Sequence, residues 1–231
     1  MLTNWNKLPE YMRTPEVKPY YDTLYKHRFS LWIKRLFDCA AAFILLVILS
    51  VPMLIIAAWI KTDSDGPVFY RQERVTKDGK HFRIHKFRTM VVNADQIGTA
   101  VTVHNDKLIT RVGKKLRYSR LDELPQVLDV LSGNMSFVGT RPEAVKYVER
   151  YKPEYFATLL LSAGITSEAS IKYKDENKLL NEAEDVDRVY LEQVLPDKMK
   201  WNLDEIKRFS LLRELGTIFR TVAAVCGRDF E

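Results

Sequence analysis

A run of 22 uncharged and almost wholly apolar residues, "CAAAFILLVILSVPMLIIAAWI" at positions 39–60, limits what this chain can fold into more than any other feature. As a helix it would measure roughly 33 Å, against a bilayer hydrocarbon core of about 30 Å, so it is long enough to cross a membrane. The segment before it is charged, aromatic and too long for the start of a signal peptide, and the run itself exceeds a signal's apolar stretch. We therefore expect the run to stay in the mature protein.

The charges that flank the run argue against a simple crossing. Residues 1–37 hold seven Lys and Arg against three Asp and Glu, and residues 61–90 hold eight against four. Short basic flanks favour the cytoplasmic side, and a single crossing would put one of them on the opposite side. Pro52 favours a bend because it removes a backbone hydrogen bond, and Ser50 can bond a carbonyl that the proline frees. Composition leaves two alternatives open: a kinked spanning helix, and a re-entrant helix that bends near Ser50 and Pro52.

Composition also restricts partners and cofactors. A net charge of +6 calls for an anionic partner, and the apolar run favours a phospholipid surface or a phosphorylated substrate over nucleic acid. The aromatic residues do not alternate with basic ones as a nucleic-acid stacking platform requires. Cys39 and Cys226 are the only cysteines, so no disulfide framework is expected, and the four scattered histidines lack zinc-ligand spacing. A metal would be a hard cation held by carboxylates or phosphate.

The rest of the pattern predicts a single α+β domain that is mainly helical. Its parts are a polar, partly ordered leader at 1–30, a membrane helix at 31–60 and a globular part at 61–231. After the membrane helix, Asp78-Gly79 predicts a β-hairpin with a two-residue type I′ turn. The stretch from Leu203 to Val225 has apolar residues at helical spacing with basic residues around them. It predicts an amphipathic helix that either lies in the membrane surface or packs on the core, and both alternatives stay open.

The segment "RYSRLDELPQVLDVLSGNMSFVGTRPE", residues 117–143, carries the densest group of chemically useful residues. Asp122 and Glu123 follow Arg117 and Arg120 and precede a proline that fits only the first turn of a helix. A helix N-terminus favours an ionised carboxylate and a bound phosphate, so the pair is suited to in-line attack on phosphorus. The plainer alternative is an acidic helix cap with surface arginines.

Two further basic motifs fit a phosphate-binding interpretation. "KFRTM" places Lys86 and Arg88 at the end of the second hairpin arm. "GTRPE" places Arg141 in a rigid loop directly before a helix, where its guanidinium can grip a phosphate with two bonds. Either motif alone is weak. With the carboxylate pair and the membrane helix, they indicate an enzyme on the cytosolic face of a membrane, acting on a phosphorylated substrate that is partly lipid.

Three ordered motifs resemble those of a known family. They are "KRLFDCAAAFILLVILSVPMLIIAAWIKTDSDGPVFYRQERVTKDGKHFRIHKFRTM", "SRLDELPQVLDVLSGNMSFVGTRPE" and "LSAGITSEASIKYKDE". Over roughly residues 31–225 the chain resembles the bacterial sugar transferases, the monotopic polyprenyl-phosphate phosphoglycosyl transferases, in their short catalytic-core form. The resemblance implies transfer of a sugar-1-phosphate from a UDP-sugar to a polyprenyl phosphate such as undecaprenyl phosphate, with release of UMP. Such a reaction begins the assembly of a surface glycan, as in exopolysaccharide or lipopolysaccharide biosynthesis.

The resemblance also implies roles for individual residues. Asp122 would be the nucleophile that forms a covalent phosphosugar intermediate, and Glu123 would support Mg²⁺ and the second step, so both are expected metal ligands. Arg117, Arg120 and Arg141 would hold phosphate oxygens, while Lys86 and Arg88 would serve either substrate. The family's membrane helix is re-entrant and anchored on the cytosolic face of the bacterial inner membrane.

Two positions depart from the family's motifs. The helix break commonly reads Ser-Pro, whereas Val51 separates Ser50 from Pro52 here, and the loop often reads Gly-Pro-Arg-Pro, whereas Thr140 replaces its first proline. Two other classes of protein stay open as rivals: a non-catalytic membrane scaffold for glycan assembly and a membrane-tethered nucleic-acid binder. The sequence names neither the sugar nor the oligomeric state, and a homodimer is left open.

Overall fold

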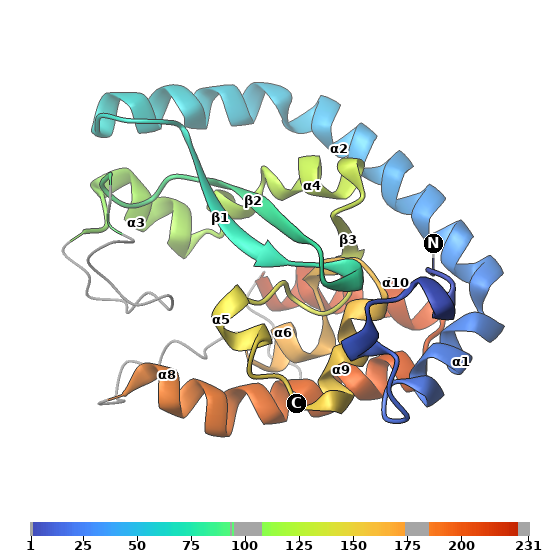
Figure 1. Cartoon of the computed structure of the whole chain (residues 1–231). Coiled ribbons are helices and arrows are strands. Elements are labelled where there is room, and N and C mark those ends of the chain that lie inside the picture. The colour runs from blue at the N-terminus through green and yellow to red at the C-terminus, as the bar shows by residue number, and fades with distance from the viewer. Residues whose placement is uncertain (1, 93, 95–107, 174–184, 226–231) are drawn as a thin grey trace.

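A computed structural model describes the chain except for residues 1, 93, 95–107, 174–184 and 226–231. The described residues form a mainly helical α+β fold with two small two-stranded sheets (Figure 1), which confirms the predicted fold class. The elements are the helices α1 (Lys18–Lys26), α2 (Arg28–Asp63), α3 (Arg111–Tyr118), α4 (Gln126–Ser132), α5 (Val145–Val148), α6 (Glu168–Lys172), α8 (Val186–Val189), α9 (Leu195–Lys207) and α10 (Leu211–Val225), and the strands β1 (Phe69–Val75), β2 (His81–Phe87), β3 (Met135–Val138) and β4 (Ala163–Thr166). Short 3-10 turns and one π-turn are η1 (Trp5–Lys7), η2 (Glu10–Met12), η3 (Lys77–Gly79), η5 (Leu121–Glu123), η6 (Pro153–Leu160) and η7 (Tyr190–Val194).

Helix α2 contains the apolar run and is continuous over 36 residues, with Pro52 inside it. By length and composition it is apolar enough to cross a membrane. Figure 1 shows it as an arc whose two halves run in different directions, as a proline inside a helix favours. The Ser50 hydroxyl donates to the Val47 carbonyl at 2.7 Å. That bond does not reach the Ile48 carbonyl, which the missing N–H of Pro52 leaves without a helical partner.

Both halves of α2 pack against the same globular body. In the first half, Ala42 is fully buried against Phe82 of β2 and Val130 of α4. In the second half, Ile56 and Ile60 are buried in a separate cluster that includes residues of β2 and α3. The outer face of the helix is exposed and apolar along its whole length. The apolar run is therefore divided lengthwise into a face that belongs to the core and a face that the rest of the described chain leaves uncovered.

The predicted hairpin is present as β1 and β2, which pair antiparallel from Phe69 with Phe87 to Val75 with His81. Asp78 and Gly79 both have positive φ values, 57° and 72°, as the Asp-Gly signal requires. The connection is longer than predicted, because this register leaves five residues, 76–80, between the strands rather than two.

The leader is better ordered than its composition suggested. Met12, Val17 and Leu24 have no exposed surface and belong to the largest core cluster. The hydroxyl of Thr3 donates to Asp78 at the hairpin turn, at 2.6 Å. The prediction of a partly ordered leader is wrong for the residues described, because apolar side chains from the turn η2 and from helix α1 anchor the segment to the body.

A second sheet was not predicted: β3 and β4 pair in parallel. Just beyond β3 the backbones approach closely, and a Cβ on Gly164 would lie 2.1 Å from the Gly139 carbonyl oxygen. The Gly164 N–H donates to the Thr140 carbonyl at 2.8 Å. This contact fixes the start of the loop that carries Arg141.

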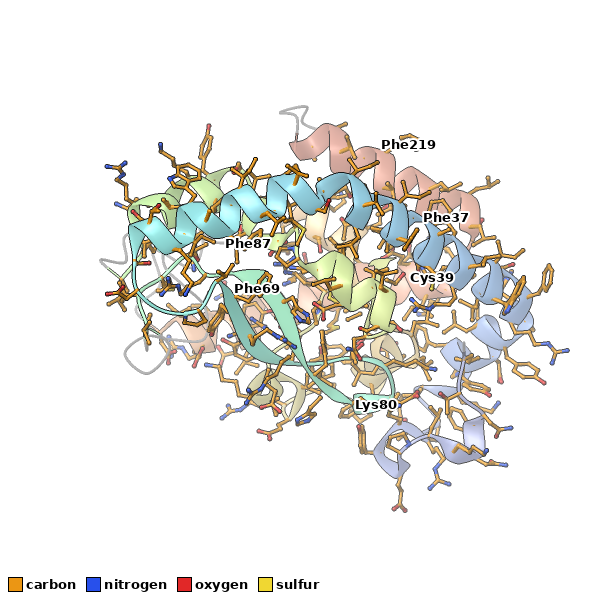
Figure 2. The ribbon with its side chains drawn as sticks, turned by 90° about the horizontal axis from the view of Figure 1, so that it is seen from above. Phe37, Cys39, Phe69, Lys80, Phe87 and Phe219 are labelled. Carbon is orange, nitrogen blue, oxygen red and sulfur yellow. The ribbon has the colours of Figure 1, made fainter. Side chains whose placement is uncertain are left out.

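The predicted C-terminal helix is divided. Helix α9 ends at Lys207 and α10 begins at Leu211. Phe209, between them, is buried in the core, whereas Leu212 and Phe219 on α10 are 80% and 74% exposed. Each alternative for this stretch thus describes one part of it: the segment up to Phe209 packs on the core, and α10 presents an apolar face to the outside. In Figure 2, Phe219 and the hairpin tip at Lys80 lie on opposite sides of α2.

Candidate functional site

Asp122 and Glu123 lie in η5, the short turn that links α3 to α4. Arg120 precedes the turn in the left-handed conformation (φ 54°), and Pro125 caps α4. The pair was predicted to lie at a helix N-terminus; it lies in a 3-10 turn just before α4, separated from Gln126 by Leu124 and Pro125. The turn also contacts β2, so two motifs about 35 residues apart in sequence meet here.

Glu123 is the electrostatic centre of this group. Its Oε1 accepts hydrogen bonds from Lys86 Nζ of β2 at 2.8 Å and from Arg141 Nη2 at 2.5 Å. Burial alone would raise the pKa of Glu123, but the charges of Arg141 and Lys86 outweigh that effect and hold the pKa well below its ordinary value. Burial lowers the pKa of Lys86, and the charge of Glu123 opposes that shift. The structure thus brings Lys86, Glu123 and Arg141 together, from three separate motifs.

Asp122 differs from its neighbour although the two are adjacent. Its side chain makes no hydrogen bond or ion pair with any other side chain in the described part of the chain. Burial raises the pKa of Asp122, and so does the negative charge of Glu123, while Lys86 and Arg117 act in the opposite direction. One carboxylate is therefore fixed between two cations, and the other is left available beside it.

The other predicted arginines occupy different places. Arg117 at the end of α3 donates to the Thr89 hydroxyl at 2.9 Å, and its charge acts on Asp122. Arg120 is exposed. Arg88 is only 5% exposed, and its guanidinium donates to the carbonyls of Asp65 and, at 2.7 Å, Ser64. Arg88 thus binds the end of α2, and none of the contacts described for it joins it to the carboxylate pair.

The sequence analysis missed a pair that ties β2 to α4. Asp129 is 1% exposed, and its carboxylate accepts the backbone N–H of His85 and contacts His85 Nδ1, both at 2.8 Å. His85 is the strand neighbour of Lys86, so this clamp fixes β2 beside η5 and α4. An aspartate between apolar neighbours in α4 was the available signal, but its partner is 44 residues away.

A second missed group anchors the loop of Arg141. Glu143 is 6% exposed, accepts a hydrogen bond from the Tyr190 hydroxyl at 2.7 Å, and lies 3.7 Å from Lys198. Its backbone carbonyl accepts the N–H of Val75 at 3.1 Å. These contacts join the loop to β1 and to the helix that runs from α8 to α9. The loop that carries Arg141 is therefore anchored on both sides, by the Gly139–Gly164 contact before Arg141 and by Glu143 after it.

The expected magnesium can be tested against these carboxylates. Among the described residues, no group of three or more His, Cys, Asp and Glu could hold a metal ion. Mg²⁺ often binds through one or two carboxylates together with substrate phosphates and water, and Asp122 fits that role. Glu123 fits less well, because both of its oxygens lie within hydrogen-bond distance of cationic side chains. The donor set present is suited to a cation shared between Asp122 and a diphosphate.

An available carboxylate, flanked by a fixed carboxylate and by lysine and arginine side chains, is an arrangement suited to reactions at phosphorus. It lies on a fold that leaves one face of a long apolar helix uncovered. The sequence model of the bacterial sugar transferase family matches residues 29–228. The chain belongs to the bacterial sugar transferase family.

Relatives with descriptive names agree with that assignment. A UDP-N-acetylgalactosamine-undecaprenyl-phosphate N-acetylgalactosaminephosphotransferase of Aeromonas hydrophila is 36% identical over 84% of this chain and 44% of its own length. Two proteins named UDP-glucose:undecaprenyl-phosphate glucose-1-phosphate transferase are similar: that of Caulobacter vibrioides is 36% identical over 85% of this chain and 70% of its own length, and that of Escherichia coli is 35% identical over 92% and 44%. The chain spans less than half the length of the Aeromonas and Escherichia proteins.

Proposed function

We propose that this chain transfers a sugar-1-phosphate from a UDP-sugar to a polyprenyl phosphate such as undecaprenyl phosphate, and so initiates surface polysaccharide or glycoconjugate assembly. The observation that carries the proposal is the contrast within the carboxylate pair. Glu123 is held by Lys86 and Arg141, while Asp122 has no side-chain partner among the described residues. The names of the relatives supply the substrate classes.

The reaction would proceed in two displacements at one phosphorus. A carboxylate oxygen of Asp122 attacks the sugar-bearing phosphorus, the bond between this phosphorus and the bridging oxygen breaks, and UMP leaves with the electron pair. An oxygen of the polyprenyl phosphate then attacks the same phosphorus, and the bond to Asp122 breaks, which restores the carboxylate. Two steps let the soluble nucleotide leave before the lipid arrives.

Surrounding residues would bind the phosphate groups and neutralise their negative charge in both displacements. Arg141 and Lys86, which already bind Glu123, would also bind phosphate oxygens. Arg117 and Arg120 would add positive charge near the pair. Glu123 holds the two cations in place and supports the second step. Mg²⁺, bound by Asp122 and the diphosphate, would neutralise charge that otherwise repels an anionic nucleophile. The contacts of Arg88 favour a different role, in which it fastens the end of α2 to β2.

We infer that α2 is re-entrant and that the protein is monotopic on the cytosolic face of the bacterial inner membrane. The packing of both halves of α2 on one body supports this, because a helix that crossed the bilayer would separate Ala42 from Ile60 by most of its thickness. Three further observations support a re-entrant helix: the bend near Ser50 and Pro52, the basic flanks, and the cytosolic supply of nucleotide sugars. A thiol label on the leader that reacts only from the periplasmic side would contradict this placement.

The decisive experiment measures UMP release. Membranes that contain the protein are incubated with a panel of UDP-sugars, Mg²⁺ and polyprenyl phosphate, and Asp122→Asn is compared with wild type. We expect release with at least one sugar, loss of at least a thousandfold in the variant, and a label from the sugar retained on the wild-type protein when the acceptor is omitted. Release of no UMP from any sugar would favour the scaffold, and equal release from the variant would exclude Asp122 as the nucleophile.

A further inference from the structure

Helix α3 concentrates positive charge beside the second half of α2. Its sequence, RVGKKLRY, has four basic residues and no acidic one. Val112 and Leu116 are buried, whereas Arg111, Lys114 and Lys115 are exposed. The exposed side of the helix is therefore a cationic face, which consists of these three residues.

The cationic face is held rigidly against α2. Val112 and Leu116 pack in one cluster with Ile56 and Ile60 of α2. The carboxylate of Asp63, the last residue of α2, accepts the backbone N–H of Val112 at 2.9 Å. Figure 1 shows α3 next to the C-terminal end of α2. The position of the cationic face is thus fixed relative to that end of the apolar helix.

Within the described residues, the charges of the cationic face are not neutralised by acidic side chains. In the described part of the chain, Arg111, Lys114 and Lys115 form no ion pair. Lys115 does contact an aromatic ring, since its Nζ lies 5.3 Å from the ring centroid of Trp59. Trp59 belongs to α2 and is 38% exposed. Tryptophan is enriched where a membrane helix reaches the headgroups, so this contact indicates headgroup depth for Lys115.

We propose that the cationic face of α3 binds the phosphate groups of anionic phospholipids in the leaflet that holds α2. Charge complementarity and the continuity with the exposed apolar side of α2 favour a lipid surface over a soluble anion. Each basic residue close to an anionic leaflet strengthens association by about fivefold, so three of them form an effective site. The inference rests on the membrane placement of α2 proposed above, and it does not depend on the transfer chemistry.

Binding there would orient the active site. Helix α3 ends at Tyr118, and the chain passes through Arg120 directly to Asp122 and Glu123. A headgroup contact along α3 would therefore hold the carboxylate pair near the depth at which a lipid phosphate lies. Arg111, Lys114 and Lys115 act in this way on the position of the site and do not touch the reacting atoms.

The test uses the full chain in nanodiscs made of phosphatidylcholine, with or without 30% (about one lipid in three) phosphatidylglycerol. Amine-reactive labelling of individual lysines is followed by mass spectrometry, with Lys200 of α9, whose side chain is 76% exposed, as the internal control. We expect phosphatidylglycerol to slow the labelling of Lys114 and Lys115 several-fold and to leave Lys200 unchanged. Equal labelling in both discs, an equal slowing of all three lysines, or failure of the chain to enter discs would overturn the proposal.

A matched pair of variants locates the effect. Arg111→Gln/Lys114→Gln/Lys115→Gln removes the cationic face, and Arg150→Gln/Lys152→Gln/Lys200→Gln removes three exposed charges elsewhere, including a lysine that also contacts an aromatic ring. The first variant should lose its preference for phosphatidylglycerol vesicles by about fivefold per charge, and the second should keep it. Equal losses would show a response to net charge alone and would refute a site on α3. None of these readouts needs UMP release, so a failed transferase assay would leave the result interpretable.

Discussion

Replacing Glu123 with Gln tests the electrostatic centre of the site. The substitution keeps the shape of the side chain and one oxygen that can accept hydrogen bonds, but it removes the charge that Lys86 and Arg141 neutralise. Two consequences follow from the contacts described above. The folded state loses charge-assisted bonding, and Asp122 loses the negative neighbour that raises its pKa.

The loss of stability can be worked out from the two contacts. Hydrogen bonds to a charged group contribute about 1.5–3 kcal/mol, and neutral ones contribute about 0.5–1.5 kcal/mol, so each of the two short bonds to Glu123 Oε1 should weaken by about 1 kcal/mol. The side chains of Lys86, Glu123 and Arg141 are 20%, 17% and 31% exposed, so solvent screens them only in part. We expect a total loss of about 2 kcal/mol, which lowers the Tm of a domain of this size by about 4–8 °C.

The stability lost in Glu123→Gln should depend on pH in a defined direction. Because the pKa of Glu123 is depressed in the folded state, its stabilising effect is present above the ordinary Glu pKa of 4.5 and is lost as the pH falls through the depressed value. The Tm difference between wild type and Glu123→Gln should therefore be largest near pH 7 and should narrow below about pH 4.5. Thermal unfolding in detergent over a pH series measures it, with the exposed Glu192→Gln as control.

The pH dependence of kcat/KM tests the same substitution independently of stability. In the proposed mechanism the nucleophile is the ionised carboxylate of Asp122, so kcat/KM should rise with pH through the pKa of Asp122. Burial and then Glu123 raise that pKa, so the acid limb of wild type should lie above that of an ordinary aspartate, and Glu123→Gln should move it to lower pH. An acid limb that stays in place or moves to higher pH would refute the coupling between the two carboxylates, whatever the effect on Tm.

Three other substitutions test the roles assigned above. Met12→Ala, at a residue with no exposed surface, should cost about 2–4 kcal/mol of stability in thermal unfolding, and an unchanged Tm would mean that the leader is not part of the core. Arg88→Lys should lower the Tm by a few degrees, because one ammonium group cannot reproduce the bonds of Arg88 to the carbonyls of Ser64 and Asp65. The KM for the UDP-sugar should stay the same, and a raised KM with a normal Tm would show that Arg88 binds substrate. Phe219→Asp should weaken liposome flotation without a change in Tm, since the ring is 74% exposed, and full flotation would show that α10 does not contact lipid.

The parts of the site that could be predicted from sequence are those encoded by local signals. The charged motifs around Asp122, Lys86 and Arg141 stood out because each is short and dense, and the structure brings them together. Arg88 shows a limit of predicting site residues from local sequence motifs. It has the same parity as Lys86, which places both on one face of a regular strand, but β2 ends at Phe87, so the alternation of faces does not extend to Arg88.

The features that could not be predicted depend on contacts between distant segments. The contact between Asp129 and His85 joins residues 44 apart in sequence, and the local sequence around either one does not indicate the other as its partner. Strands β3 and β4 have four residues each, and apolar runs of that length do not distinguish a strand from a buried helical turn. The leader lacked a single period because its buried side chains come partly from a 3-10 turn and partly from the short helix α1 rather than from one long helix.

The first half of α2 has a consequence for how such a protein can be taken apart. Lys34 donates to the Val138 carbonyl at 3.0 Å and pairs with Glu214 of α10 at 2.7 Å, and Asp38 accepts a hydrogen bond from the Ser136 hydroxyl at 2.8 Å. The apolar helix is thus fastened by charged and polar bonds to the strand that leads to Arg141. It is not a modular segment that a protein engineer could exchange for another apolar helix or delete while keeping the rest of the fold intact. Removal would leave Glu214 without Lys34 and would uncover two apolar clusters. With the membrane placement proposed above, purification of the intact chain would therefore start from detergent or native lipid.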